Sequence, residues 1–414
     1  MLAQSNSSLS NEYPLSTTSP QAAAMVKCFQ TSPFFSVLGG LCLLVLIFTQ
    51  GVGVGVGAAG WIGVNYGTVA DNLPPPTRVA NFLTQSTLIN RVRFFDANPD
   101  MLRAFAHTGI AITVTIPNDQ IPLLTNVDFA RRWVGANVLP YLHSTNIIRI
   151  LVGNEVISTA SKLLIVSLVP AMQSLHAALT RDSLDRRIKI STPHSLGILS
   201  NSSPPSAGKF RQGYDVYVLE PLLGFLRATA SPFMINPYPF FGCSSGTLDY
   251  ALFRPNEGVL DASTGLRYAN MLDAQLDAVF SAMKRLGFDD VDIMIAETGW
   301  PWKGDAGQVG VDVESAAEYN RKLIQHVTSG TGTPLMPNRT FETYIFALFN
   351  EDLKPGPTCE RNFGVFHPNL TPVYPMGILK PMVSSSGSRT GHRQSVYLLF
   401  VVFLLRTNFF MCFS

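Results

Sequence analysis

The stretch IIRILVGNE at residues 147–155 holds the two features that decide the fold. Apart from Arg149, every residue before Gly153 is apolar, which is typical of a strand in a parallel sheet covered on both faces. The run then ends in Asn154 and Glu155, so polar groups follow the carboxyl end of the strand. A strand of this kind needs parallel neighbours and crossover helices that cover them.

Seven more runs of the same kind occur along the chain. They are IGVNYG (62–67), RVRFFD (91–96), AITVTIP (111–117), KISTPHS (189–195), PFMINPYPFF (232–241), DIMIAETGW (292–300) and TYIFALFNE (343–351). Helical patterns lie between them, most clearly at 265–287, where apolar residues recur every three or four positions. Further helices are predicted at 75–85, 129–142, 166–184 and 314–327.

Eight strands that alternate with helices predict an α/β fold, a single (β/α)8 TIM barrel. The segment 352–381 contains many prolines and no helical period, so we expect the eighth helix to be short or missing. A doubly wound open sheet is disfavoured, because the chain shows neither a topological switch point nor a glycine-rich first turn.

The two ends of the chain differ from this alternating part. Residues 34–48, FFSVLGGLCLLVLIF, form an uncharged apolar run that is typical of a secretory signal, with a retained signal anchor as the alternative. Small residues at 384–388, a polar spacer and an apolar tail at 396–405 are typical of a glycolipid (GPI) anchor signal, with a poor membrane helix as the alternative.

These patterns divide the chain into three parts. We expect a signal peptide with an N-terminal extension at 1–60, the barrel catalytic domain at 61–380 and the anchor signal at 381–414. The candidate attachment sites are Ser384, Ser385 and Ser386. The protein is therefore expected at the cell surface, bound to the outer leaflet of the plasma membrane, as a monomer.

The composition excludes several functions. The 30 Lys and Arg residues nearly balance the 28 Asp and Glu residues, so we expect no nucleic-acid partner. The seven histidines form no HExxH or HxH motif, and we expect neither a metal nor another cofactor. Of the five cysteines, Cys243 and Cys359 lie in the barrel, and whether they pair is left open. Three sequons in the barrel part of the chain predict N-glycosylation, at Asn201, Asn338 and Asn369.

Carboxylates and aromatic residues follow the predicted strands, at the barrel end where catalytic groups lie. Glu155 and Glu297 are far apart in sequence and can meet only because both end strands of one closed barrel. A proton donor, a nucleophile and flat apolar platforms for sugar rings are what cleaving a glycosidic bond requires. The alternative for these two residues is a pair of salt-bridged rim glutamates.

Five ordered motifs resemble those of glycoside hydrolase family 17, the plant-type glucan endo-1,3-β-glucosidases. They are IGVNYG (62–67), VGNE (152–155), INPYPFF (235–241), AETGWP (296–301) and ALFNEDLKPG (347–356), followed by RNFGVFHPNLTPVYP (361–375). The resemblance implies retaining endo-hydrolysis of β-1,3-glucans such as callose or laminarin. It also implies the branch without a Cys-rich carbohydrate-binding module. A β-1,3-glucan-binding or a transglycosylating cell-wall protein on the same barrel remains the alternative.

The resemblance also implies roles for single residues. It makes Glu155 the acid/base and Glu297 the nucleophile, while Glu351 and Lys354 resemble a carboxylate and lysine of the family that we expect to pair. From the residues themselves, Asn154 is expected to bind a sugar hydroxyl and Tyr238 to donate to Glu297. Candidate sugar platforms are Tyr66, Trp300 and Phe346, and also Phe240 and Phe241. A turn-forming Asn, a core Tyr, an ordinary rim salt bridge and barrel-filling aromatics are the respective alternatives.

Overall fold

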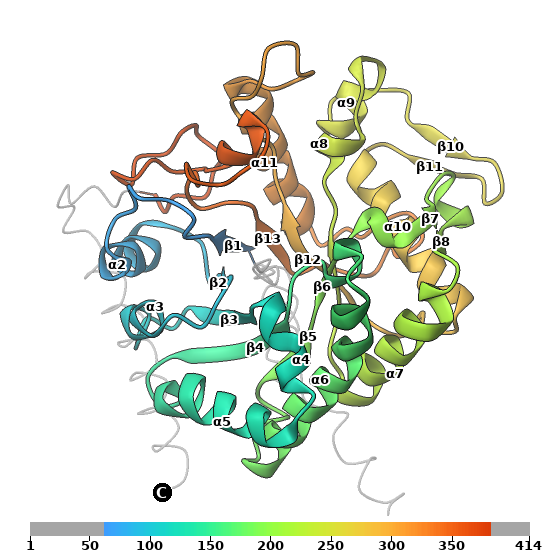
Figure 1. Ribbon diagram of the computed structural model, residues 1–414. Helices are drawn as coiled ribbons and strands as arrows, with labels where there is room; N and C mark the ends of the chain where they lie inside the picture. Colours follow the sequence, from blue (N-terminus) through green and yellow to red (C-terminus); the bar gives the residue numbers. More distant parts are fainter. Residues whose placement is uncertain (1–61, 382–414) are drawn as a thin grey trace, which may run out of the picture. The chain divides into compact units, whose positions relative to one another are not determined.

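The computed structural model describes residues 62–381, drawn in colour in Figure 1. The predicted signal segment and the candidate attachment sites Ser384, Ser385 and Ser386 lie outside the described residues.

Nine parallel strands form one sheet, in the order β5-β4-β3-β2-β1-β13-β12-β9-β6. They are β1 (Ile62–Tyr66), β2 (Arg91–Phe94), β3 (Ala111–Ile116), β4 (Asn146–Val152), β5 (Lys189–Ser191), β6 (Pro193–Ser195), β9 (Phe233–Asn236), β12 (Ile293–Thr298) and β13 (Thr343–Ile345). The edge strands β5 and β6 are separated in sequence by Thr192 alone, so one predicted run pairs with β4 on one side and β9 on the other. The sheet thereby closes into a ring (Figure 1), and the predicted barrel is confirmed.

Helices surround this ring. They are α2 (Pro76–Ser86), α3 (Pro99–Ala104), α4 (Ile121–Leu124), α5 (Val127–Asn137), α6 (Lys162–Arg181), α7 (Glu220–Thr229), α10 (Met271–Arg285) and α11 (Val313–Thr328). The five predicted helices are confirmed with shifted ends, whereas α3, α4 and α7 were not predicted. In the described residues after β13, a 3-10 turn at Thr358–Arg361 takes the place of an eighth helix, as expected.

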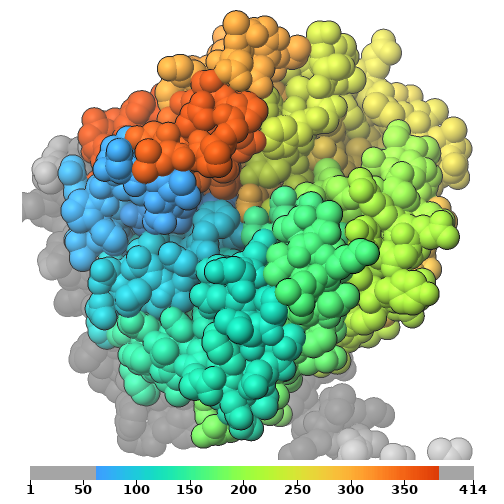
Figure 2. Space-filling view, in the orientation of Figure 1, coloured from blue at the N-terminus to red at the C-terminus, as the bar shows by residue number. Residues whose placement is uncertain are grey.

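Smaller elements extend the loops on which strands end. They are the short helices α8 (Pro239–Gly242) and α9 (Leu248–Ala251) and the hairpins β7 (Leu199–Asn201) with β8 (Lys209–Phe210) and β10 (Val259–Asp261) with β11 (Leu266–Tyr268). Figure 2 shows the orange-red segments after β13 beside the blue segment after β1. The backbone N–H of Leu353 donates to the Val69 carbonyl at 3.1 Å, which joins these two loops.

Alternate strand residues face the helices and the inside of the ring. In β4, Ile150 and Val152 pack in the large core that includes helix residues, whereas Leu151 belongs to a separate buried cluster. That cluster also contains Met234, Met294, Ala296 and Tyr344. Because these residues come from different strands of the ring, they form an apolar layer inside the barrel, as barrel interiors require.

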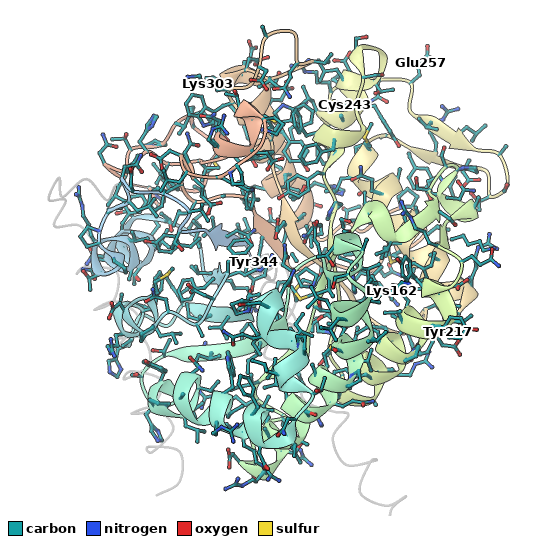
Figure 3. All side chains as sticks on the ribbon, viewed as in Figure 1. Lys162, Tyr217, Cys243, Glu257, Lys303 and Tyr344 are labelled. Atoms are coloured by element: carbon teal, nitrogen blue, oxygen red, sulfur yellow. The ribbon has the colours of Figure 1, made fainter. Side chains whose placement is uncertain are left out.

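Gly63 in β1 makes room for this layer. A Cβ atom at this position would lie 2.4 Å from a ring carbon of Tyr344. Figure 3 labels Tyr344 near the centre of the ring of strands, while the labelled Lys162 and Tyr217 lie toward its outside. Polar residues occupy the barrel interior at both ends of the apolar layer, and they build the sites described below.

Candidate active site

Glu297 reaches the barrel interior because β12 contains a bulge. Ile295 pairs with Thr343 and Thr298 with Ile345, so β12 has one more residue than β13 over this step. Ala296 belongs to the interior layer, while the Thr298 hydroxyl meets the Tyr319 hydroxyl of α11 at 2.6 Å, outside the ring. Strict alternation from Ala296 would send Glu297 outward and Thr298 inward. The extra residue turns it inward, which is the re-aiming that bulges beside active sites perform.

Two donors hold the Glu297 carboxylate. Arg93 Nη1 donates to Oε1 at 2.7 Å, and the Tyr238 hydroxyl donates to Oε2 at 3.0 Å. The Arg93 side chain is fully buried, so its charge acts on Glu297 with little screening by water. A cation and a hydroxyl donor on separate oxygens stabilise and orient an ionised carboxylate.

Glu155 occupies a different environment. Its backbone is left-handed, with φ of 51°, and its N–H donates to the Pro193 carbonyl at 2.9 Å. This conformation costs about 1–2 kcal/mol for a residue with a Cβ atom and is concentrated at functional sites. Asn236 Nδ2 donates to Glu155 Oε1 at 2.8 Å.

The pKa of Glu155 is raised. Burial is the largest cause and the neighbouring charge of Glu297 adds to it, while Asn236, Arg93 and Lys354 act in the opposite direction. The two carboxyls therefore differ in the way that an acid and a nucleophile do, because burial and a like charge favour the protonated form of Glu155, whereas Glu297 accepts from a cation and a hydroxyl group.

Arg93 also positions Asn154. Its Nη2 donates to Asn154 Oδ1 at 2.7 Å, and the Asn154 N–H donates to Asn118 Oδ1 at 2.8 Å. Since the amide oxygen of Asn154 accepts from Arg93, its NH2 group remains as a donor for a ligand. Sequence reasoning missed Arg93 because it lies in the middle of a strand. The available signal was a charged residue within an otherwise buried run.

A cavity of about 380 Å³ collects these groups. Its lining residues are Asn154, Glu155, Ser195, Leu196, Gly197, Asn236, Tyr238, Phe241, Glu297, Phe346, Lys354, Glu360 and Phe363. A second cavity of about 360 Å³ shares Ser195 and Gly197 with it and continues past Tyr214 and Arg211. The two together make an open groove rather than a closed pocket for one sugar.

Two predicted sugar platforms are buried elsewhere. Tyr66 is 2% exposed and contacts the edges of Phe94 and Phe349. Trp300 has no exposed surface, and its Nε1 donates to the Gly310 carbonyl at 2.7 Å. Neither lines the active-site cavity, so the alternative of barrel-filling aromatics applies to both. Phe346 does line it, as do Phe241, which is 60% exposed, and Phe363, which was not predicted.

The expected ion pair between Glu351 and Lys354 is wrong. Lys354 Nζ lies 3.2 Å from Glu360 Oε2 and 4.6 Å from the centre of the Phe346 ring. Glu351 is buried and accepts from the Val69 N–H at 3.1 Å. Burial is the largest cause that raises its pKa, and the Lys354 charge acts against that rise. Glu351 therefore supports the loop beneath the site and does not line the cavity.

The remaining predicted residues lie away from this cavity. Both cysteines are free, which answers the question of their pairing: Cys243 Sγ donates to the Phe240 carbonyl, and Cys359 Sγ accepts from Gln308. The sequon residues Asn201, Asn338 and Asn369 are all exposed. Their glycosylation stays a prediction.

Comparison with known proteins places the chain in a family. The family model described as glycosyl hydrolases family 17 matches residues 62–378. A glucan endo-1,3-beta-glucosidase of Triticum aestivum is 51% identical over 324 residues, 77% of this chain and 70% of the relative. Glucan endo-1,3-beta-glucosidase 7 of Arabidopsis thaliana is 48% identical over 335 residues, 80% of this chain and 66% of the relative.

A solved structure is similar to this chain as well. It is CJP38, a beta-1,3-glucanase and pollen allergen of Cryptomeria japonica, with a TM-score of 0.73 and 42% identity. The match covers 77% of this chain and 99% of that one. With the family model over the whole barrel, these likenesses show that this chain is a glycoside hydrolase and belongs to glycosyl hydrolases family 17.

Proposed function

We propose that this glycoside hydrolase cleaves internal β-1,3-glucosidic bonds of β-glucans and that the anomeric configuration is retained. The observation that carries the proposal is the contrast between two carboxyls on one cavity. Glu297 is held by Arg93 and Tyr238, whereas the pKa of Glu155 is raised by burial and by Glu297. The names of the plant relatives support the linkage.

The first step forms a covalent intermediate. Glu297 attacks the anomeric carbon and forms a carbon–oxygen bond, while the bond from that carbon to the glycosidic oxygen breaks. Glu155 gives its proton to the departing oxygen. As the charge of Glu297 is consumed, the charge repulsion that raises the pKa of Glu155 disappears. Glu155 thus becomes a carboxylate when the next step needs a base.

The second step reverses these roles. Glu155 takes a proton from a water molecule, the water oxygen attacks the anomeric carbon, and Glu297 leaves as a carboxylate. Arg93 and the Tyr238 hydroxyl stabilise that leaving carboxylate. The free NH2 group of Asn154 is suited to bind the sugar hydroxyl beside the anomeric centre, where hydrogen bonds strengthen in the transition state.

The groove fits a polymer cut away from its ends. The wall of the catalytic cavity contains the rings of Phe241, Phe346 and Phe363, which offer apolar surface to sugar faces. The adjoining cavity past Tyr214 gives room for further sugar units on the side of Glu155. Both features favour attack within a chain.

Attachment to the cell surface is part of the proposal. The apolar run at 34–48 supports secretion, and the pattern at 384–405 supports a GPI anchor, with N-glycans at Asn201, Asn338 and Asn369. Release of the protein from intact cells by a phospholipase that cleaves GPI anchors tests the anchor. Protein that stays on the cells after this treatment would contradict it.

The activity is tested with purified protein on laminarin. We expect new reducing ends from the wild type and none above background from Glu297→Ala, with equal circular dichroism spectra for both. Proton NMR of the first product should show the β anomer, and an α anomer would overturn the assigned roles. Binding without reducing ends would instead identify a glucan-binding protein, and longer products at high oligosaccharide concentration a transglycosylase.

A further inference from the structure

A further cavity, separate from the two that form the catalytic groove, opens at the opposite end of the barrel, where the strands begin. Its volume is about 660 Å³, larger than that of the catalytic cavity. It is lined by Arg149 of β4, Lys189 of β5 and the segments 290–294 and 338–342. The apolar layer that includes Leu151 separates it from the catalytic groups. Volumes of about 300–1,000 Å³ are typical of sites for small molecules.

The inner wall of this cavity carries excess positive charge. Arg149 pairs in register with Thr113 on one side and Lys189 on the other, so the three side chains share the barrel interior. Glu342 is the carboxylate here, and it lies 3.1 Å from Arg149 and 3.5 Å from Arg91. On the cavity wall Glu342 thus faces Arg149, which is 6% exposed, and Lys189 stands beside Arg149 in register.

Two further cations of the wall contact only neutral acceptors. Lys189 Nζ donates to the Thr229 carbonyl at 3.0 Å, and Arg339 Nη1 donates to the Val291 carbonyl at 3.3 Å. Within residues 62–381, neither has a carboxylate at ion-pair distance. The carboxylates of the outer rim belong to Asp290, which pairs with Arg227, and to Asp292, which is exposed.

We propose that this cavity binds an anionic small molecule through an oxyanion, either a phosphate group or the carboxylate of a sugar acid. Arginine and lysine are the side chains that recognise both groups. Their attraction for an anion is stronger in a walled cavity than on an open surface, because water screens it less. The site is distinct from the catalytic groove and does not depend on the proposed glucanase activity.

The test measures binding to purified protein at constant ionic strength by calorimetry. The probes are inorganic phosphate, galacturonate and, as the neutral match, galactose. We expect saturable binding of at least one of the two anions and none of galactose. Binding of phosphate alone would assign the site to phosphate groups, and binding of galacturonate alone would assign it to sugar acids.

Variants locate the binding. Lys189→Gln and Arg339→Gln each remove a cation that has no carboxylate at ion-pair distance within residues 62–381, and we expect each to weaken anion binding by at least about tenfold, or 1.4 kcal/mol. Lys162→Gln removes an exposed lysine of α6 and should leave binding unchanged. All three should keep wild-type activity on laminarin. The absence of saturable anion binding, or equal affinity in wild type and Lys189→Gln, would overturn the proposal.

Discussion

Each end of the barrel interior contains a cluster of glutamate, arginine and tyrosine. Carboxylates are in excess at one end and arginines at the other. At the catalytic end, Glu297 accepts from Arg93 and Tyr238; at the other end, Glu342 accepts from Arg149 and Tyr344. The first cluster has a further carboxylate, Glu155, on the same cavity, while the second has a further arginine on the same glutamate.

This difference shows what makes a buried Glu-Arg-Tyr group reactive. A single carboxylate between two arginines is neutralised and has a structural role. A second carboxyl beside the pair creates charge repulsion. This repulsion adds to burial, which is the larger cause, in raising the pKa of Glu155. The chemistry therefore depends on surplus negative charge, and the buried ion pair alone does not provide it.

Replacing either Glu297 or Glu342 by glutamine should give the largest difference between the two ends of the barrel. Glu297→Gln removes the nucleophile, and we expect kcat on laminarin to fall by at least about a thousandfold with the fold intact. Glu342→Gln takes the carboxylate away from the buried Arg149, so the free energy of unfolding should fall by about 3–5 kcal/mol while kcat stays near wild type. Urea unfolding and reducing-end assays measure both. Similar losses of kcat in the two variants would contradict the comparison.

Replacing Arg93 or Arg149 tests how the charge of each arginine contributes at its end of the barrel. Arg93→Met and Arg149→Met should both lower the free energy of unfolding, by about 3–5 kcal/mol each. Arg93 also lowers the pKa of Glu155, so in Arg93→Met that pKa should rise and the alkaline limb of the kcat/KM profile should move to higher pH.

The Arg149→Met profile should stay in place, because Arg149 lies beyond the apolar layer. Arg93→Lys keeps a charge and should bring the alkaline limb back toward its wild-type position. An alkaline limb that does not move in Arg93→Met would show that Arg93 has only a structural role.

The two tyrosines give a smaller effect. Tyr238→Phe removes the hydroxyl that donates to Glu297, and a hydrogen bond to a charged group is worth about 1.5–3 kcal/mol, so kcat should fall by about ten- to a hundredfold. Tyr344→Phe removes the equivalent hydroxyl at Glu342 and serves as the matched control, with kcat unchanged. Equal kcat in Tyr238→Phe and the wild type would remove Tyr238 from the site.

The smallest effect concerns the proton of Glu155. Asn236 donates to its carboxylate and lowers its pKa, so Asn236→Ala should raise that pKa further. Because Glu155 must be protonated to act as an acid, the alkaline limb of the kcat/KM profile should move to higher pH, by less than about one pH unit. A shift to lower pH would contradict the assignment of Glu155 as the acid.

Most of the fold could be predicted because each strand is a short apolar run with a clear end. The residues after those ends, Glu155, Tyr238 and Glu297, were predicted for the same reason. Arg93 was not, because the direction of a residue in mid-strand depends on register and ring closure, which the sequence does not display. The burial of Tyr66 and Trp300 was missed because an aromatic ring at a strand end can face either the core or the groove.

The ion pair of Lys354 illustrates another limit. Glu360 was not predicted as its partner because it lies on the 3-10 turn after the eighth strand, and no periodic pattern announces that turn. Loop geometry of this kind is set by contacts between distant segments.

Because of the bulge in β12, the position of the nucleophile depends on one extra residue in that strand. Deletion of Ala296, the one residue between Ile295 and Glu297, would restore regular alternation, and the Glu297 carboxylate would then take the place of Ala296 in the apolar layer instead of lying beside the sugar. The ring would keep its closure, since Ile295 and the residues before it retain their partners on β9. The loss of one codon would therefore take the nucleophile out of the site and put a charge into the apolar layer, while the strand pairing is kept.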